Sequence, residues 1–147
     1  MSVPEYVYVA SSWRNVSQPA VVTALRAAGL GVYDFRHPRR DSSGFAWSDI
    51  DPEWKSWTSA QYLAALNHPL AVEGFCNDFD AMRTADTFVL VLPCGRSAHL
   101  ELGWAVGAGK RAAIVLNGDH EPELMVKMVD FITPTISGLL TWIDGLS

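Results

Sequence analysis

The sequence predicts an α/β fold built on a parallel sheet. Three observations predict this fold: short β-rich runs alternate with stretches of helical spacing, polar or glycine-containing loops separate them, and the length suits one domain. The chain has 147 residues, of which 49% are hydrophobic and 18% are charged. We therefore expect one domain over residues 1–147 with a sizeable buried core.

The first strand, loop and helix are predicted near the start of the chain. Tyr6–Ala10 is a β-rich run, a polar loop follows over residues 11–15, and residues 19–28 carry apolar side chains at helical spacing before a glycine. Residues 30–35 then form a second β-rich run. A strand, a helix and a second strand in this order are typical of a parallel sheet.

Residues 36–57 interrupt this alternation and carry several tryptophans. The segment is too long for a plain connection, and long ordered loops in compact domains are commonly lids or binding loops. The ring of Trp47 suits a flat ligand, but the aromatic side chains could equally cover a thin part of the core or a dimer interface. Both interpretations of this Trp-rich segment stay open at this point.

Two helices are predicted after the Trp-rich segment. Thr58 and Ser59 are able to cap a helix that runs through Tyr62 and Leu66, and residues 70–84 form a second helix. The second helix carries Asp78 and Asp80, and their two-residue spacing places them on different faces. Only one of these two carboxylates is therefore expected to point into a site above the sheet.

Three more strands complete the predicted sheet, at residues 87–92, 111–116 and 131–132. In parallel α/β sheets the ligand normally lies beyond the carboxyl ends of the strands. The loops that follow the strands are therefore the places to look for functional side chains.

The loop after the third strand opens a helix and is rich in polar groups. Ser97 is available as N-cap, and Arg96, Ser97 and His99 stand together at this helix start, which favours an anion. The helix dipole disfavours protonation of His99, so we expect a neutral imidazole that donates a hydrogen bond. Glu101 follows, and it either complements the helix dipole or acts chemically.

Composition excludes several classes of function. The formal net charge is −5 and no long basic run is present, which disfavours a nucleic-acid polymer as ligand. The longest apolar runs are strand-length, so no membrane span is expected. No secretory signal is visible and the two cysteines suggest reduced thiols, so the expected location is the cytoplasm. The histidines are not paired at helical spacing, so we expect no metal.

Three motifs, in the same order along the chain, resemble those of the nucleoside 2-deoxyribosyltransferase superfamily. They are residues 8–15, residues 77–86, and residues 99–105 with the following Gly109 and Lys110. The superfamily includes transferases that exchange bases between nucleosides and hydrolases that cut the N-glycosidic bond of nucleoside 5′-monophosphates. The resemblance implies a doubly wound, Rossmann-like or flavodoxin-like sheet of five parallel strands in the order 2-1-3-4-5.

The resemblance also implies roles for individual residues. Glu101 matches the catalytic glutamate that attacks the anomeric carbon, and Asp78 matches the aspartate that handles the departing base. Tyr8 lies at a position that often lines the sugar site. Ser12 and Arg14 fall where the hydrolases carry a phosphate loop, so substrate binding is expected there.

One departure from the family pattern indicates a phosphorylated substrate. Transferases commonly carry an acidic residue just ahead of the glycine-rich turn, whereas this chain has Arg96 and Ser97 after Gly95. His99 falls where a cytidylate-cleaving branch also carries histidine. We therefore expect hydrolysis of a nucleoside 5′-monophosphate through Glu101, a reaction that needs no cofactor.

Three alternatives to hydrolysis remain open: base exchange on nucleosides, cleavage of NAD, and a non-catalytic nucleotide sensor. Each would use a small-molecule nucleotide or nucleoside as ligand. A homodimer is expected in each case, because Gly103 and Gly107 leave a flat helical face and because subunits assemble in the resembled family.

Overall fold

The sheet has five strands, all parallel, in the order β2-β1-β3-β4-β5. The computed structural model describes residues 4–39, 42–118 and 121–146, so residues 40–41 of the Trp-rich segment lie outside the described residues. The strands are β1 (Tyr6–Ala10), β2 (Gly31–Asp34), β3 (Thr87–Val91), β4 (Arg111–Val115) and β5 (Phe131–Thr133). The predicted fold class and strand order are confirmed.

The helices lie close to their predicted positions, with one addition at the end of the chain. They are α1 (Gln18–Ala27), α2 (Ser59–Leu66), α3 (Pro69–Thr84), α4 (Arg96–Gly107) and α5 (Ile136–Asp144), with short 3-10 turns η1 (Trp47–Asp49), η2 (Trp54–Ser56) and η3 (Leu124–Met128). Thr58 caps α2 as predicted: its hydroxyl accepts from Gln61 N–H at 3.2 Å, and the Gln61 side chain accepts from Thr58 N–H at 2.7 Å. The sequence did not predict α5.

The chain divides into two compact units. The sheet unit comprises Met1–Asp34 and Thr84–Ser147 and holds the whole sheet with α1, α4 and α5. The helical unit comprises Phe35–Arg83 and holds α2 and nearly all of α3. Each unit is described by itself, and the expectation of one domain over residues 1–147 stays a prediction.

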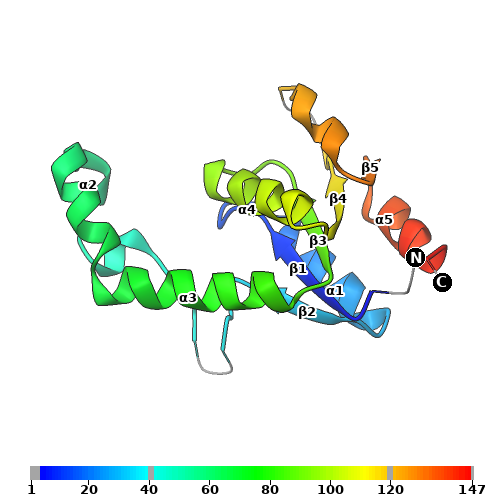
Figure 1. Cartoon of the computed structure of the whole chain (residues 1–147), viewed down its shortest axis with the longest axis horizontal. Helices are drawn as coiled ribbons and strands as arrows, with labels where there is room; N and C mark the ends of the chain where they lie inside the picture. Colours follow the sequence, from blue (N-terminus) through cyan, green and yellow to red (C-terminus); the bar gives the residue numbers. More distant parts are fainter. Residues whose placement is uncertain (1–3, 40–41, 119–120, 147) are drawn as a thin grey trace. The chain divides into compact units, whose positions relative to one another are not determined.

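Helices cover both faces of the sheet, with α1 and α5 on one side and α4 on the other (Figure 1). Alternation along the strands explains these two layers, because successive side chains point to opposite faces. Val7 and Val9 pack against α1 and α5, whereas Tyr8 and Phe88 lie on the face covered by α4, where Trp104 contacts Phe88. In β3 the side chains on both faces are buried beneath helices, so the strand is a nearly continuous run of apolar residues.

The carboxyl ends of all five strands meet at one edge of the sheet, because the strands are parallel. β1 and β3 are hydrogen-bonded neighbours, so the loops that follow them start side by side. At the same edge Gln18 Nε2 donates to Asp34 Oδ1 at 2.9 Å, which ties the first turn of α1 to the end of β2. This edge is where a ligand binds in open parallel sheets.

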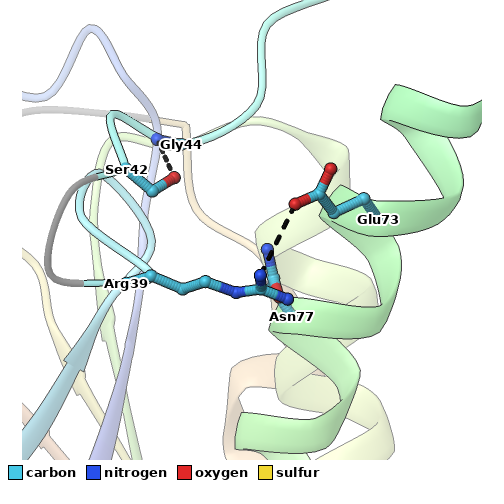
Figure 2. Close-up of polar contacts among 5 residues, drawn as sticks. All are labelled: Arg39, Ser42, Gly44, Glu73 and Asn77. Carbon is cyan, nitrogen blue, oxygen red and sulfur yellow. Dashed lines mark hydrogen bonds and ion pairs between the residues drawn. The ribbon is translucent and has the colours of Figure 1, made fainter.

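In the helical unit, α3 holds the beginning of the Trp-rich segment in place. Arg39 donates to Asn77 Oδ1 at 2.9 Å and pairs with Glu73 at 3.7 Å, both on α3 (Figure 2). A Cβ at Gly74 would lie 2.9 Å from the Cβ of Phe45, so Phe45 packs directly on the helix backbone at this glycine. The segment is therefore anchored on α3 by two polar contacts of Arg39 and one apolar contact of Phe45.

Candidate active site

The loop after β1 is a tight turn that presents Ser12 and Arg14 at the carboxyl edge of the sheet. Asn15 N–H donates to Ser12 O at 3.0 Å, and Arg14 N–H donates to Ser12 Oγ at 3.0 Å. Ser12 is half-buried and Arg14 is exposed. A hydroxyl and a guanidinium on one short turn are the groups expected of a phosphate-binding loop.

The helix start after β3 differs from the predicted one. The N-cap of α4 is Gly95, whose backbone is extended and which makes no side-chain cap hydrogen bond. Ser97 is the second residue of the helix, so its predicted role as N-cap is wrong: the backbone becomes helical at Arg96, before Ser97 is reached. Because no acidic residue lies in this first turn, the positive end of the helix dipole is not complemented by a carboxylate.

The imidazole of His99 bonds back to its own helix start. Its Nδ1 lies 3.0 Å from Gly95 O and 3.6 Å from Cys94 Sγ. A carbonyl can only accept, so Nδ1 carries the hydrogen, and in the neutral ring Nε2 is then an acceptor. The hydrogen bond that we expected His99 to donate therefore goes from Nδ1 to the Gly95 carbonyl. In the neutral ring, Nε2 is then the atom that can accept a hydrogen bond from a ligand.

Glu101 lies two residues after His99 on α4 and is half-buried. Burial and, to a smaller extent, the negative charge of Glu101 together raise the pKa of the Cys94 thiol to about 11. The Glu101 carboxylate is thus close enough to the turn after β3 for its charge to act there. Arg96 and Ser97, the first two residues of the same helix, directly follow that turn.

Tyr8 lies in the interior of β1 and is buried. Its ring stacks on Tyr33 at 5.2 Å and on Phe88 at 4.9 Å between ring centroids. Two stacked neighbours fix the orientation of the ring. Its contribution to a sugar site stays a prediction.

Asp78 and Asp80 differ in their surroundings on α3. Asp80 is exposed and pairs with Arg83 one turn along the helix, at 3.9 Å. Asp78 is half-buried. An exposed pair at this spacing is typical of a solvated helix face, which leaves Asp78 as the candidate. Asp78 belongs to the helical unit, so its meeting with Glu101 stays a prediction.

Trp47 is the centre of an aromatic cluster within the helical unit. Its ring contacts Phe45 at 4.8 Å, Trp57 at 5.6 Å and Tyr62 at 6.0 Å between centroids. These edge-on contacts are those of a small core. They favour the interpretation that the aromatic side chains stabilise this unit, and contact of Trp47 with a substrate stays a prediction.

Two side chains that hold the turn after β3 were missed as functional candidates. Ser11 Oγ donates to Val91 O at 2.8 Å, and Asn15 Nδ2 donates to Val91 O at 3.3 Å and to Pro93 O at 3.0 Å. An asparagine just before a predicted helix signals a cap. The bonds of Asn15 to Val91 and Pro93 join residues more than 70 positions apart, so they leave no local signal in the sequence.

Within the described ranges, no three His, Cys, Asp or Glu side chains gather in a way that could hold a metal ion. No helix in that part of the chain combines the length and the apolar character needed to cross a membrane.

Comparison with protein-family models and with curated proteins finds no match to this chain. Comparison with solved structures does find matches. One is a 2-deoxyribosyltransferase from the psychrotolerant bacterium Bacillus psychrosaccharolyticus, with 18% identity and a TM-score of 0.63 over 91% of this chain and 89% of that one. Another is the CMP N-glycosidase BcmB of Clostridium botulinum, with 17% identity and a TM-score of 0.52 over 95% of this chain and 99% of that one.

Both structural matches extend over most of each chain. At these identities the likeness is one of fold. It supports the resemblance carried by the three sequence motifs, which lie on β1, on α3 and on α4. The chain therefore shares the fold of these two proteins.

Proposed function

We propose that this protein is an N-glycosidase that hydrolyses nucleoside 5′-monophosphates with Glu101 as nucleophile. The observation that carries the proposal is the position of Glu101 on α4. It follows the cationic turn after β3 and lies near enough to Cys94 to affect its thiol. The loop with Ser12 and Arg14 follows the neighbouring strand. A carboxylate and a phosphate-binding loop at one sheet edge are what this reaction requires.

In the proposed reaction one Glu101 oxygen bonds to the anomeric carbon of the sugar while the bond from that carbon to the base nitrogen breaks. The electron pair of the broken bond leaves with the base, which receives a proton. Asp78 is the proposed source of this proton. Water then attacks the anomeric carbon of the glycosyl ester and gives up a proton to Asp78, which releases the pentose 5′-phosphate and restores both the Glu101 carboxylate and the protonated Asp78.

The groups around the turn favour a phosphorylated substrate over a free nucleoside. Arg14 and Arg96 supply positive charge, and Ser12 and Ser97 supply hydroxyls. Charge-assisted hydrogen bonds to phosphate are roughly twice as strong as neutral ones. Likeness to a CMP N-glycosidase over 95% of this chain agrees with this substrate class.

Base exchange is the second candidate, since the match to a 2-deoxyribosyltransferase has a TM-score of 0.63. Exchange and hydrolysis share the covalent Glu101 intermediate and differ in whether a second base or water attacks it. Sensitivity to an added acceptor base separates the two reactions.

We also propose that the protein is a homodimer of the cytoplasm. Large apolar side chains are exposed on α4 and η3, among them Leu100 at 75% and Leu124 at 77%. A Cβ added at Gly103 or Gly107 would meet nothing within 4 Å, so this face of α4 is open. Light scattering coupled to gel filtration tests the dimer, and fractionation of cells tests the location.

The decisive experiment is a substrate panel read by chromatography. Nucleosides, their 5′-monophosphates and NAD are incubated with the protein, each with and without an acceptor base. The proposal expects free base and pentose 5′-phosphate from monophosphates, in amounts that the acceptor base leaves unchanged. Products from NAD alone, or a new nucleoside that appears only with the acceptor, would contradict it.

Glu101→Gln is the variant that tests the nucleophile. It keeps the size of the side chain but removes its charge, so turnover should fall by about 10³-fold or more while the thermal midpoint changes little. Glu53→Gln, at an exposed position of the helical unit, is the matched control and should retain full activity. Near wild-type turnover in the Glu101 variant would refute its catalytic role.

A further inference from the structure

We propose that Asn15 is a positioning residue, which holds the turn after β3 and the start of α4 in register with the loop after β1. The inference rests on the function proposed above, because it concerns the geometry in which Glu101 and the phosphate-binding groups meet the substrate. It adds a residue that neither touches substrate in the proposed reaction nor belongs to the predicted site.

Both ends of the Asn15 carboxamide are engaged. Its Oδ1 accepts from Ser17 N–H at 2.8 Å and from Gln18 N–H at 2.9 Å, while its Nδ2 donates to Val91 O and Pro93 O. Two lone pairs and two hydrogens make up the hydrogen-bonding capacity of a carboxamide. The side chain is 4% exposed, so these bonds lie away from water and each is costly to break.

The acceptor end of Asn15 engages two N–H groups at the start of α1. Because Oδ1 accepts from the N–H groups of Ser17 and Gln18, these donors at the start of α1 are already used. In the proposed function the phosphate is held by the turn with Ser12 and Arg14 together with the turn after β3. The distance between these two turns becomes critical, and Asn15 bridges them.

Two other side chains support the same stretch of backbone. Ser11 Oγ donates to Val91 O at 2.8 Å, and Asn117 Nδ2 donates to Leu92 O at 3.4 Å from the loop after β4. Asn15 differs from both in reaching Pro93 O and in accepting, with the same side chain, from the N–H groups of Ser17 and Gln18 at the start of α1. It thus couples the loop after β1, the start of α1 and the turn after β3.

Two variants remove the donor end of Asn15 and keep an acceptor for the N–H groups at the start of α1. Asn15→Asp keeps an oxygen for the N–H groups of α1 and places a second oxygen against the two carbonyls. Asn15→Ser also retains an acceptor for α1 but introduces no charge and is too short to reach Pro93. Asn117→Gly is the matched control: it removes the longer bond to Leu92, and glycine tolerates the φ of 53° at that position.

Hydrogen exchange and steady-state kinetics give two independent readouts, both taken well below the thermal midpoint. In both Asn15 variants we expect amides of residues 92–100 to exchange about 5- to 10-fold faster, from the loss of one or two buried hydrogen bonds. We expect kcat to fall by about 10- to 100-fold, since small displacements of catalytic groups cost factors of this size. Asn117→Gly should stay within about 3-fold of wild type in both measurements.

The outcomes distinguish the role of Asn15 from the proposed function. Unchanged exchange in a folded Asn15→Ser variant overturns the inference, and so does faster exchange with unchanged kcat and KM, which would indicate stability alone. If wild type cleaves no nucleotide, the proposed function fails. Faster exchange in the Asn15 variants together with weaker binding of a nucleoside monophosphate would then still support the positioning role, and unchanged binding would overturn it.

Discussion

Asp86 provides a sharp test of how the sheet is held together at its amino edge. It precedes β3, and its Oδ2 accepts from the N–H groups of Glu5 and Tyr6 at 2.9 and 3.0 Å. Its Oδ1 accepts from Thr87 Oγ1 at 2.6 Å. One carboxylate therefore supplies the acceptors that the entrance of β1 requires. Asp86→Ala removes all three bonds, and Asp86→Asn keeps the shape but removes the charge.

The expected destabilisation follows from the number and exposure of these bonds. Hydrogen bonds to charged groups contribute about 1.5–3 kcal/mol each, but Asp86 is largely exposed, so water replaces much of what is lost. We expect Asp86→Ala to lower the free energy of unfolding by about 2 kcal/mol and Asp86→Asn by about 1 kcal/mol. For a chain of this length these values correspond to decreases of about 4–8 °C and 2–4 °C in the thermal midpoint.

The same contribution should depend on pH. Burial raises the pKa of the Asp86 carboxyl, but hydrogen bonds from Thr87, Tyr6 and Glu5 and the charge of Arg111 lower it more, so the pKa in the folded state lies below its usual value. A group of this kind stabilises the folded state above its unfolded pKa, and the stabilisation is lost as the pH falls through the folded value. The difference in midpoint between wild type and Asp86→Asn should therefore be largest near pH 7 and shrink toward pH 3.

Thermal melts of the purified proteins at pH 7, 5 and 3 measure this directly. Asp49→Asn is the control, because Asp49 is exposed and no hydrogen bond of its carboxylate is seen among the described residues. Its midpoint should match that of wild type at each pH. A pH-independent difference for Asp86→Asn, or a midpoint unchanged in Asp86→Ala, would refute the assigned role of the carboxylate.

Three further predictions concern the proposed phosphate loop, the Trp-rich segment and the thiols. Arg14→Ala should lower kcat/KM for monophosphates about 10- to 100-fold and leave the matching nucleosides little affected, because a charge-assisted hydrogen bond to phosphate is lost. Gly74→Ala should destabilise the protein by about 1–3 kcal/mol in denaturant unfolding, because its Cβ would lie 2.9 Å from the Cβ of Phe45. Iodoacetamide at pH 8 should modify exposed Cys76 well before Cys94, since a pKa of about 11 leaves roughly 0.1% of the Cys94 thiol ionised.

Internal comparisons control each of these experiments. Equal losses on nucleosides and monophosphates would mean that Arg14 supports the loop and does not bind phosphate. Gly103→Ala is the partner of Gly74→Ala: a Cβ there meets nothing within 4 Å, so this substitution should be neutral or stabilising by up to about 1 kcal/mol. Destabilisation of similar size in both glycine variants would contradict the packing argument, and equal labelling rates at the two cysteines would contradict the burial of Cys94.

Much of the fold could be predicted from local patterns in the sequence. Continuous apolar runs such as that of β3, which is buried along its length, are visible without tertiary information. The capping box of Thr58 is visible in the same way, because both of its hydrogen bonds are made with Gln61, three residues further on. The strand order needed the family resemblance, since hydrophobic periodicity shows that strands exist but not which strands are neighbours. The sequence did not predict α5, although its N-cap bond, from Gly138 N–H to the Thr135 side chain, also spans only three residues.

The candidate site was predicted less completely, for reasons that differ from residue to residue. The motifs indicated Ser12, Arg14 and Glu101, and the structure brings their loops to neighbouring strands. The side chain of Ser97 suits an N-cap, yet the N-cap is Gly95 and the backbone is already helical at Arg96. Side-chain preference alone does not decide where a helix begins.

The role of Asn15 was decided only by the tertiary structure. Asparagine commonly accepts hydrogen bonds from N–H groups at the start of a helix, and the bond of Asn15 to Gln18 N–H spans only three residues. Its bonds to Val91 and Pro93 cross 76 and 78 residues of sequence, and they exist because pairing of β1 with β3 brings the two following loops together. Periodicity and capping preference act over a few residues, so they determine which elements form. Contacts between loops depend on how the strands pair, and only the folded chain establishes that pairing.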